Sequence, residues 1–223
     1  MTFPNGFHGI KKIFTSEILD LIASVCMIVC AVLTIVFLAS ADADAAGGAI
    51  AGGLGAVAFL LAALVLSIIA YIFKLIGIKR AGRDEERFNT AFIFAIFALI
   101  LTIVSSVIAS ITGTNSIWDD LIKTIATLFE LLVTLYIVNG IQAFGERLGH
   151  EELVQKGRTY FIIFLILYIL RMIASVIPVF FGANETTASI SGTMLLVSAI
   201  LSLICYILYL ALLGKAKKVL KTN

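Results

Sequence analysis

Six long apolar stretches, separated by short polar connections, constrain this chain more than any other feature. They run over residues 18–38, 49–78, 88–111, 117–141, 159–181 and 188–213. A hydrocarbon core about 30 Å thick is crossed by about 20 residues of α-helix, so each stretch is long enough to span it. Lipid offers the backbone no hydrogen bonds, so such stretches fold as helices. The sequence therefore predicts an all-α, polytopic membrane protein with six transmembrane helices.

The composition argues against a soluble fold. Of the 223 residues, 61% are hydrophobic and 13% are charged, whereas a soluble domain usually has about 25% charged residues. The polar connections are too short to form domains of their own. We therefore expect residues 1–223 to form a single domain in the lipid bilayer, with the plasma or inner membrane as its expected location.

The start of the chain leaves two interpretations open. Apolar residues at helical spacing within residues 1–15 predict a short helix in the headgroup region, and a solvated terminus is the alternative. Residues 39–41 (Ala-Ser-Ala) resemble a signal-peptide cleavage site, but the apolar run before them exceeds the 7–15 residues of a signal-peptide core. We expect a retained first helix, with Asp20 as a first-turn or capping acid.

The charged residues predict the orientation of the six spans. Lys and Arg occupy the N-terminal segment, the second and fourth connections and the C-terminal tail. The first, third and fifth connections contain Asp42, Asp44 and Glu185 and neither Lys nor Arg. By the positive-inside rule, both termini are cytoplasmic. The basic rim is expected to contact anionic lipid and not nucleic acid.

The spans also resemble one another in pairs. Tyr71, Tyr136 and Tyr206 take similar positions near the cytoplasmic ends of the even-numbered spans, and residues 106–108 match residues 175–177 (Ser-Val-Ile). We therefore predict three repeated hairpins that point the same way, as in transporters built from parallel repeats. They cover approximately residues 16–80, 88–145 and 157–214.

Small residues open the second span. Gly48 and Gly52 lie four residues apart, and Gly55 follows Ala51 at the same spacing. In a membrane, small residues at this spacing allow two helix backbones to approach closely. The glycines superficially resemble a phosphate loop, but the Lys-Ser/Thr pair that such a loop needs does not follow them. They are predicted to form a helix-packing face.

Two opposite charges are expected near the membrane midplane. Glu130 lies 13 residues after Ile117 and Arg171 lies 12 residues after Thr159, or about 20 and 18 Å from opposite faces at 1.5 Å per residue. Charges at this depth are costly and usually paired. We therefore predict a buried Glu130–Arg171 pair that joins the fourth and fifth spans.

A second group of charges lies nearer the predicted outer end of the fourth span. Asp119 and Asp120 precede Lys123 by four and three residues, within side-chain reach on a helix. In the favoured interpretation Lys123 snorkels outward to these acids. In the alternative, these three residues continue through Glu130 and Arg171 as a polar track that lines a vestibule.

The chemically reactive side chains predict no enzyme, cofactor or metal site. Cys26, Cys30 and Cys205 lie in apolar stretches, where thiols usually behave as small hydrophobic groups. His8 and His150 are far apart in the sequence and belong to no zinc motif. On these grounds we expect a protein that is not an enzyme.

Two functions remain for a chain of this kind. The first is a scaffold or accessory subunit, which would pack against a membrane partner or a second copy and use Glu130–Arg171 as a structural lock. The alternative is a small transporter or channel that uses the pair as a gate or as a site for the substrate's charge. A water-filled cavity at Glu130 favours transport, whereas a dry and fully paired site favours the scaffold.

Overall fold

The computed structural model describes residues 3–41, 46–112, 117–181 and 185–222, and they form six helices. The helices are α1 (Pro4–Ala41), α2 (Ala46–Ala81), α3 (Glu86–Thr112), α4 (Ile117–Arg147), α5 (Glu151–Phe181) and α6 (Glu185–Thr222). All six are long and apolar enough to cross a membrane. The prediction of an all-α protein with six potential membrane spans is therefore confirmed. Side chains near the helix ends at residues 37–53, 112–120 and 171–192 lie outside the description.

The first and last helices extend beyond the predicted spans. α1 begins at Pro4, a residue type favoured in the first turn of a helix, and continues without a break into the apolar stretch. Among the described residues of this segment the chain is helical from Pro4 onward, in place of a separate surface helix or a solvated terminus. Asp20 consequently lies well inside α1, so the expectation of a first-turn or capping acid was wrong. The basic tail also continues α6, as far as Thr222.

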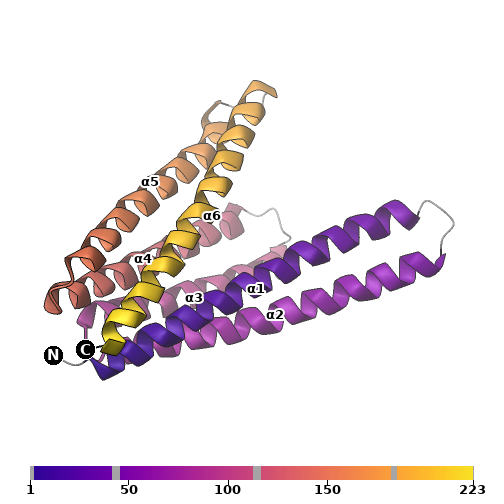
Figure 1. Ribbon diagram of the computed structural model, residues 1–223. Helices are drawn as coiled ribbons and strands as arrows, with labels where there is room; N and C mark the ends of the chain where they lie inside the picture. Colours follow the sequence, from indigo (N-terminus) through magenta and orange to yellow (C-terminus); the bar gives the residue numbers. More distant parts are fainter. Residues whose placement is uncertain (1–2, 42–45, 113–116, 182–184, 223) are drawn as a thin grey trace.

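Successive helices pack as antiparallel pairs, with α1 along α2, α3 along α4 and α5 along α6 (Figure 1). The N-terminus, the C-terminus and the turns after α2 and α4 all lie at one end of the bundle. We call this the closed end. Away from it, the α1–α2 pair and the α5–α6 pair diverge. The paired packing fits three hairpins, whereas the sequence repeat and the cytoplasmic location of the termini remain predictions.

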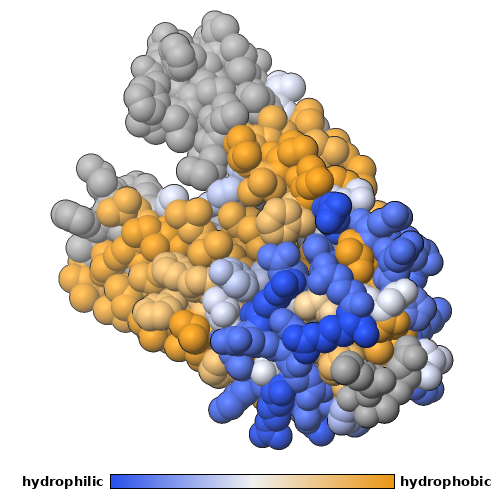
Figure 2. Space-filling model, turned by 90° about the vertical axis from the view of Figure 1, so that its left-hand side faces the viewer, coloured by the Kyte–Doolittle hydropathy of each residue, from blue (hydrophilic) through white to orange (hydrophobic). Residues whose placement is uncertain are grey.

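The buried core lies toward the closed end. Its largest fully buried side chains come from all six helices and include Ile10, Ile78, Phe88, Phe144 and Leu213. Hydrophilic residues gather at this end of the molecule and hydrophobic residues cover its flanks (Figure 2). Many large apolar side chains of the flanks are exposed. A surface of this kind suits contact with lipid tails and is rare on a soluble monomer.

Polar contacts tie the turn between α2 and α3 to its neighbours. The Asp84 carboxylate accepts hydrogen bonds from the Asn5 side chain at 3.0 Å and from the Gly6 N–H at 2.7 Å. It thereby stabilises the N-terminus of α1, where unpaired N–H groups favour an anion. Glu85, which is buried, pairs with Arg147 of α4 at 2.7 Å. This turn therefore joins α1 and α4 at the closed end.

α6 is held to two helices at the same end. The Lys215 ammonium pairs with the Glu152 carboxylate of α5. The Lys217 ammonium lies over the Phe14 ring of α1, 4.5 Å from its centroid. The contact between the first and last helices closes the ring of helices here, although the same helices separate farther along (Figure 1).

Glycines permit a close contact between the backbones of α1 and α2 at this end. A Cβ atom built on Gly77 would lie 2.9 Å from the Gly9 carbonyl oxygen and 2.8 Å from Cγ1 of Ile13. The glycines that were predicted to form a packing face lie near the start of α2, away from the closed end. Gly48 and Gly52 fall outside the residues whose surroundings are described, and a Cβ on Gly55 would make an ordinary 3.5 Å contact with Leu33.

We expect Gly77→Ala to destabilise the protein in detergent, because the added methyl group meets backbone atoms that cannot move independently. Overpacking of this kind typically costs about 1–3 kcal/mol, against a gain in helix propensity of up to about 1 kcal/mol. Gly55→Ala is the matched control and should be neutral or stabilising. Unfolding by dodecyl sulfate in mixed micelles, followed by circular dichroism, measures both changes. Equal stability of the two variants would contradict the close contact.

Candidate functional site

A cavity of about 540 Å³ lies between the helices, and all six contribute residues to its wall. Its volume falls within the range of about 300–1,000 Å³ that is usual for small-molecule sites. Glu17 on the wall lies 13 residues after the start of α1, or about 20 Å from the closed end at the rise of an α-helix. The cavity is therefore deep enough to lie within the hydrocarbon region.

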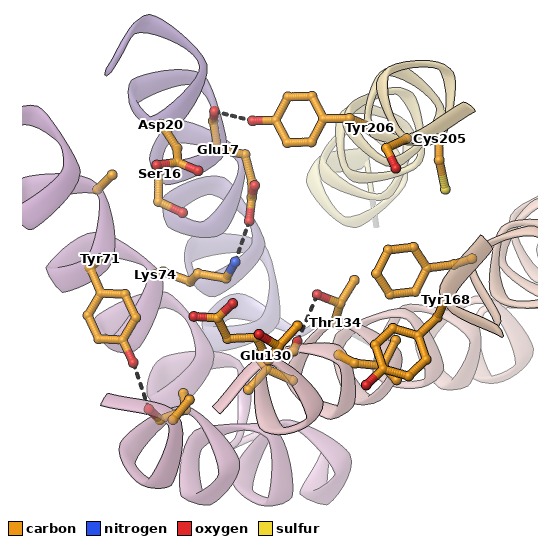
Figure 3. Close-up of a pocket in the computed structure, with 18 of the residues that line it drawn as sticks. Ser16, Glu17, Asp20, Tyr71, Lys74, Glu130, Thr134, Tyr168, Cys205 and Tyr206 are labelled. Carbon is orange, nitrogen blue, oxygen red and sulfur yellow. Dashed lines mark hydrogen bonds and ion pairs between the residues drawn. The ribbon is translucent and has the colours of Figure 1, made fainter. Parts of the chain in front are cut away.

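An ion pair between α1 and α2 forms part of the cavity wall (Figure 3). The Lys74 Nζ atom lies 2.8 Å from Glu17 Oε1, and the exposed fractions of the two side chains are 27% and 6%. The Glu17 backbone carbonyl also accepts a hydrogen bond of 2.5 Å from the Tyr206 hydroxyl of α6. α1 is thus held to α2 by charge and to α6 by a hydrogen bond at the same residue.

Two further carboxylates face the cavity. Asp20 lies one turn beyond Glu17 on α1, and Glu130 enters from α4. Figure 3 shows Glu130 on the Lys74 side of the cavity. Both side chains are exposed, and within the described part of the chain neither carboxylate has a hydrogen bond or an ion pair. Ionisable groups in such positions usually face a water-filled space or a ligand.

Aromatic rings cover much of the remaining wall. The Tyr71 hydroxyl donates a 2.6 Å hydrogen bond to the Ala95 carbonyl of α3, which fixes its ring beside the cavity. Tyr160 of α5 stacks on Phe164 with a centroid distance of 5.6 Å, and on its other neighbour Tyr209 at 5.3 Å. The wall therefore combines carboxylates with flat apolar surfaces.

Only part of the predicted site can be compared with these observations. Glu130 lies at the cavity, but the side chains of Arg171, Asp119 and Asp120 fall outside the described residues. The Glu130–Arg171 pair and the polar track therefore remain predictions. Lys123 has an exposed side chain and is not among the described residues of the cavity wall.

The buried ion pair that the structure does show, Glu17–Lys74, was missed by the sequence analysis. Glu17 was placed outside the first span because the apolar stretch begins at Ile18. Lys74 lies inside the predicted second span, where no role was assigned to it. The available signal was the helical spacing of Glu17 and Asp20, which puts both acids on one face once α1 is extended back to Pro4.

The cavity offers no evident site for a bound metal ion. No group of three or more potential ligands among His, Cys, Asp and Glu is arranged around one point in the described ranges. Cys205 lines the cavity, and all three cysteines are free thiols. The arrangement is suited to binding by charge and by aromatic contact.

Comparisons with models of known families, with curated proteins and with solved structures find no match to this chain. These comparisons therefore suggest no substrate and no partner for the chain. The cavity, its charges and the helices that form it are the features of the chain that bear on function.

We expect Lys74→Met to destabilise the protein strongly, because it leaves the Glu17 carboxylate without its partner inside the membrane. Loss of one member of a buried pair typically costs about 3–5 kcal/mol, whereas replacement of both members can be nearly neutral. The double change Glu17→Gln with Lys74→Met should therefore recover most of the loss. The control Lys218→Met removes an exposed lysine of α6 and should have little effect.

Thermal unfolding in detergent, followed by light scattering and circular dichroism, compares these variants. If Lys74→Met is as stable as the parent, or if the double variant is no more stable than Lys74→Met, the pair does not hold α1 to α2 in the way described.

Proposed function

We propose that this chain is a small membrane transport protein that binds its substrate in the central cavity and exposes it to the two sides of the membrane in turn. The observation that carries the proposal is the pair of exposed carboxylates, Asp20 and Glu130, in a cavity of about 540 Å³ formed by all six helices. Charged sites between helix repeats near the membrane centre are typical of secondary transporters.

The same observation weighs against a purely structural role. A scaffold that uses buried charges as a lock needs them paired, because an uncompensated charge in hydrocarbon destabilises the fold. Three carboxylates, those of Glu17, Asp20 and Glu130, face the cavity, whereas the base among the described residues of its wall is Lys74, which pairs with Glu17. A hydrated cavity that receives a charged ligand accounts for these carboxylates, so we favour transport over the scaffold.

The packing of the helices supports movement about the closed end. Contacts such as Lys215–Glu152 between α5 and α6, and Lys217 over the Phe14 ring between α6 and α1, hold that end together. The α1–α2 pair meets α6 there and diverges from it farther along (Figure 1). We propose that α1–α2 rocks against α5–α6 as a unit, in the manner of rigid-body domain closure. With the closed end in the cytoplasm, as the positive-inside rule predicts, the structure is an outward-facing state.

Thiol accessibility tests this function without knowledge of the substrate. We expect Ser202→Cys, at a residue that lines the cavity, to react with a membrane-impermeant methanethiosulfonate from either side of the membrane. The background carries alanine at the three native cysteines, and labelling is measured in intact cells and in inverted vesicles. Ile207→Cys is the matched control on the same helix, where the side chain is 58% exposed on the apolar surface, and it should stay unlabelled from both sides.

Three results are informative. Labelling of Ser202→Cys from both sides supports alternating access. Absence of labelling from both sides indicates a dry cavity, which would contradict transport and favour the scaffold. Labelling from one side alone indicates a fixed vestibule, which would contradict a carrier that opens to each side.

A further inference from the structure

The charge balance of the cavity wall determines what kind of ligand it suits. Among the described residues of the wall, the acids are Glu17, Asp20 and Glu130 and the base is Lys74. The 2.8 Å pair uses Lys74 and Glu17, which leaves two negative charges. In a site with little water, opposite charges attract strongly and like charges repel strongly. The wall therefore favours a cation over an anion.

The aromatic part of the wall indicates which kind of cation the cavity suits. Rings of Tyr71, Tyr160, Phe164, Tyr168 and Tyr206 line the cavity from α2, α5 and α6. Aromatic faces attract cations electrostatically and also bury apolar surface. A bare metal ion needs a small cage of oxygen ligands, whereas this cavity has a volume of about 540 Å³ and no group of three or more His, Cys, Asp or Glu side chains that could hold a metal within the described residues. An organic cation with an apolar body fits both properties.

A buried hydroxyl next to the wall points to a ligand or a water molecule as well. Tyr209 is 3% exposed, and its hydroxyl has no hydrogen-bond partner among the described residues. Its ring stacks on Tyr160, a residue of the wall, at a centroid distance of 5.3 Å. Buried polar groups normally have partners. A water molecule or a polar group of a ligand at this side of the cavity would supply one.

We propose that the cavity binds a monovalent organic cation, with its charge between Asp20 and Glu130 and its apolar body against the tyrosine rings. This proposal rests on the proposed transport function only in that it takes the bound cation to be the transported substrate. The binding site itself depends on the charges and rings of the wall.

Binding of tetraphenylphosphonium to the purified protein tests this site. Equilibrium dialysis in detergent measures binding, and tetraphenylborate serves as an anion of matched size and shape. We expect saturable binding of the phosphonium and none of the borate. The double variant Asp20→Asn with Glu130→Gln should weaken phosphonium binding by about tenfold or more, because each removed charge contributes to the attraction. Glu146→Gln, which alters an exposed carboxylate of α4 near the closed end, should leave it unchanged.

The proposal is overturned if the parent protein does not bind the phosphonium saturably, if the borate binds equally well, or if the double variant binds like the parent. Size-exclusion chromatography and thermal unfolding confirm that the variants are folded. If the double variant does not fold, Asp20→Asn alone decides, and it should weaken binding whereas Glu146→Gln does not. Labelling of Ser202→Cys from both sides without phosphonium binding would overturn the proposed cation site and leave the proposed transport function intact. Phosphonium binding together with labelling of Ser202→Cys from one side alone would overturn transport and leave the cation site intact.

Discussion

The contact between Lys74 and Glu17, at 2.8 Å inside the helix bundle, is the interaction on which the rest of the structure depends. Neither charge is stable alone in a hydrocarbon environment, so α1 and α2 must keep these faces together. Gly9 and Gly77 allow the two backbones to approach closely at the same interface. With α1 fixed in this rotation, Asp20 one turn farther along also faces the interior.

The polar interior follows from this arrangement. Tyr206 bonds to the carbonyl of Glu17 and brings α6 to α1, and Tyr71 bonds to the carbonyl of Ala95 and brings α2 to α3. Between these contacts the wall is left with carboxylates and rings in place of a packed apolar core. The apolar core extends from the closed end to the cavity, where Tyr160, Leu167 and Cys205 belong to both. The bundle is thus tightly packed at the closed end and contains a cavity with charged groups on its wall farther along.

The sequence predicted the membrane fold well and the site only in part. Six apolar stretches specify six helices because lipid allows little else. Glu130 was recognised because a lone carboxylate in an apolar stretch is conspicuous. Glu17 and Lys74 were not, since Glu17 lies just before the first apolar stretch and Lys74 lies one to two turns before the charged residues that follow the second. Which side chains of two helices form an ion pair depends on the rotation and tilt of those helices. The hydropathy of the sequence gives no information on either.

The central claim is that the α1–α2 pair moves relative to α5–α6 around a charged cavity. The most direct measurement is the distance distribution between spin labels at Val57 of α2 and Val197 of α6, by pulsed electron paramagnetic resonance in lipid nanodiscs. Both side chains are exposed, so the labels should not disturb the packing. The account predicts two populations for this pair and a single population for the control pair Val32 and Val57, which lies within α1–α2. A single narrow distance for both pairs would contradict it.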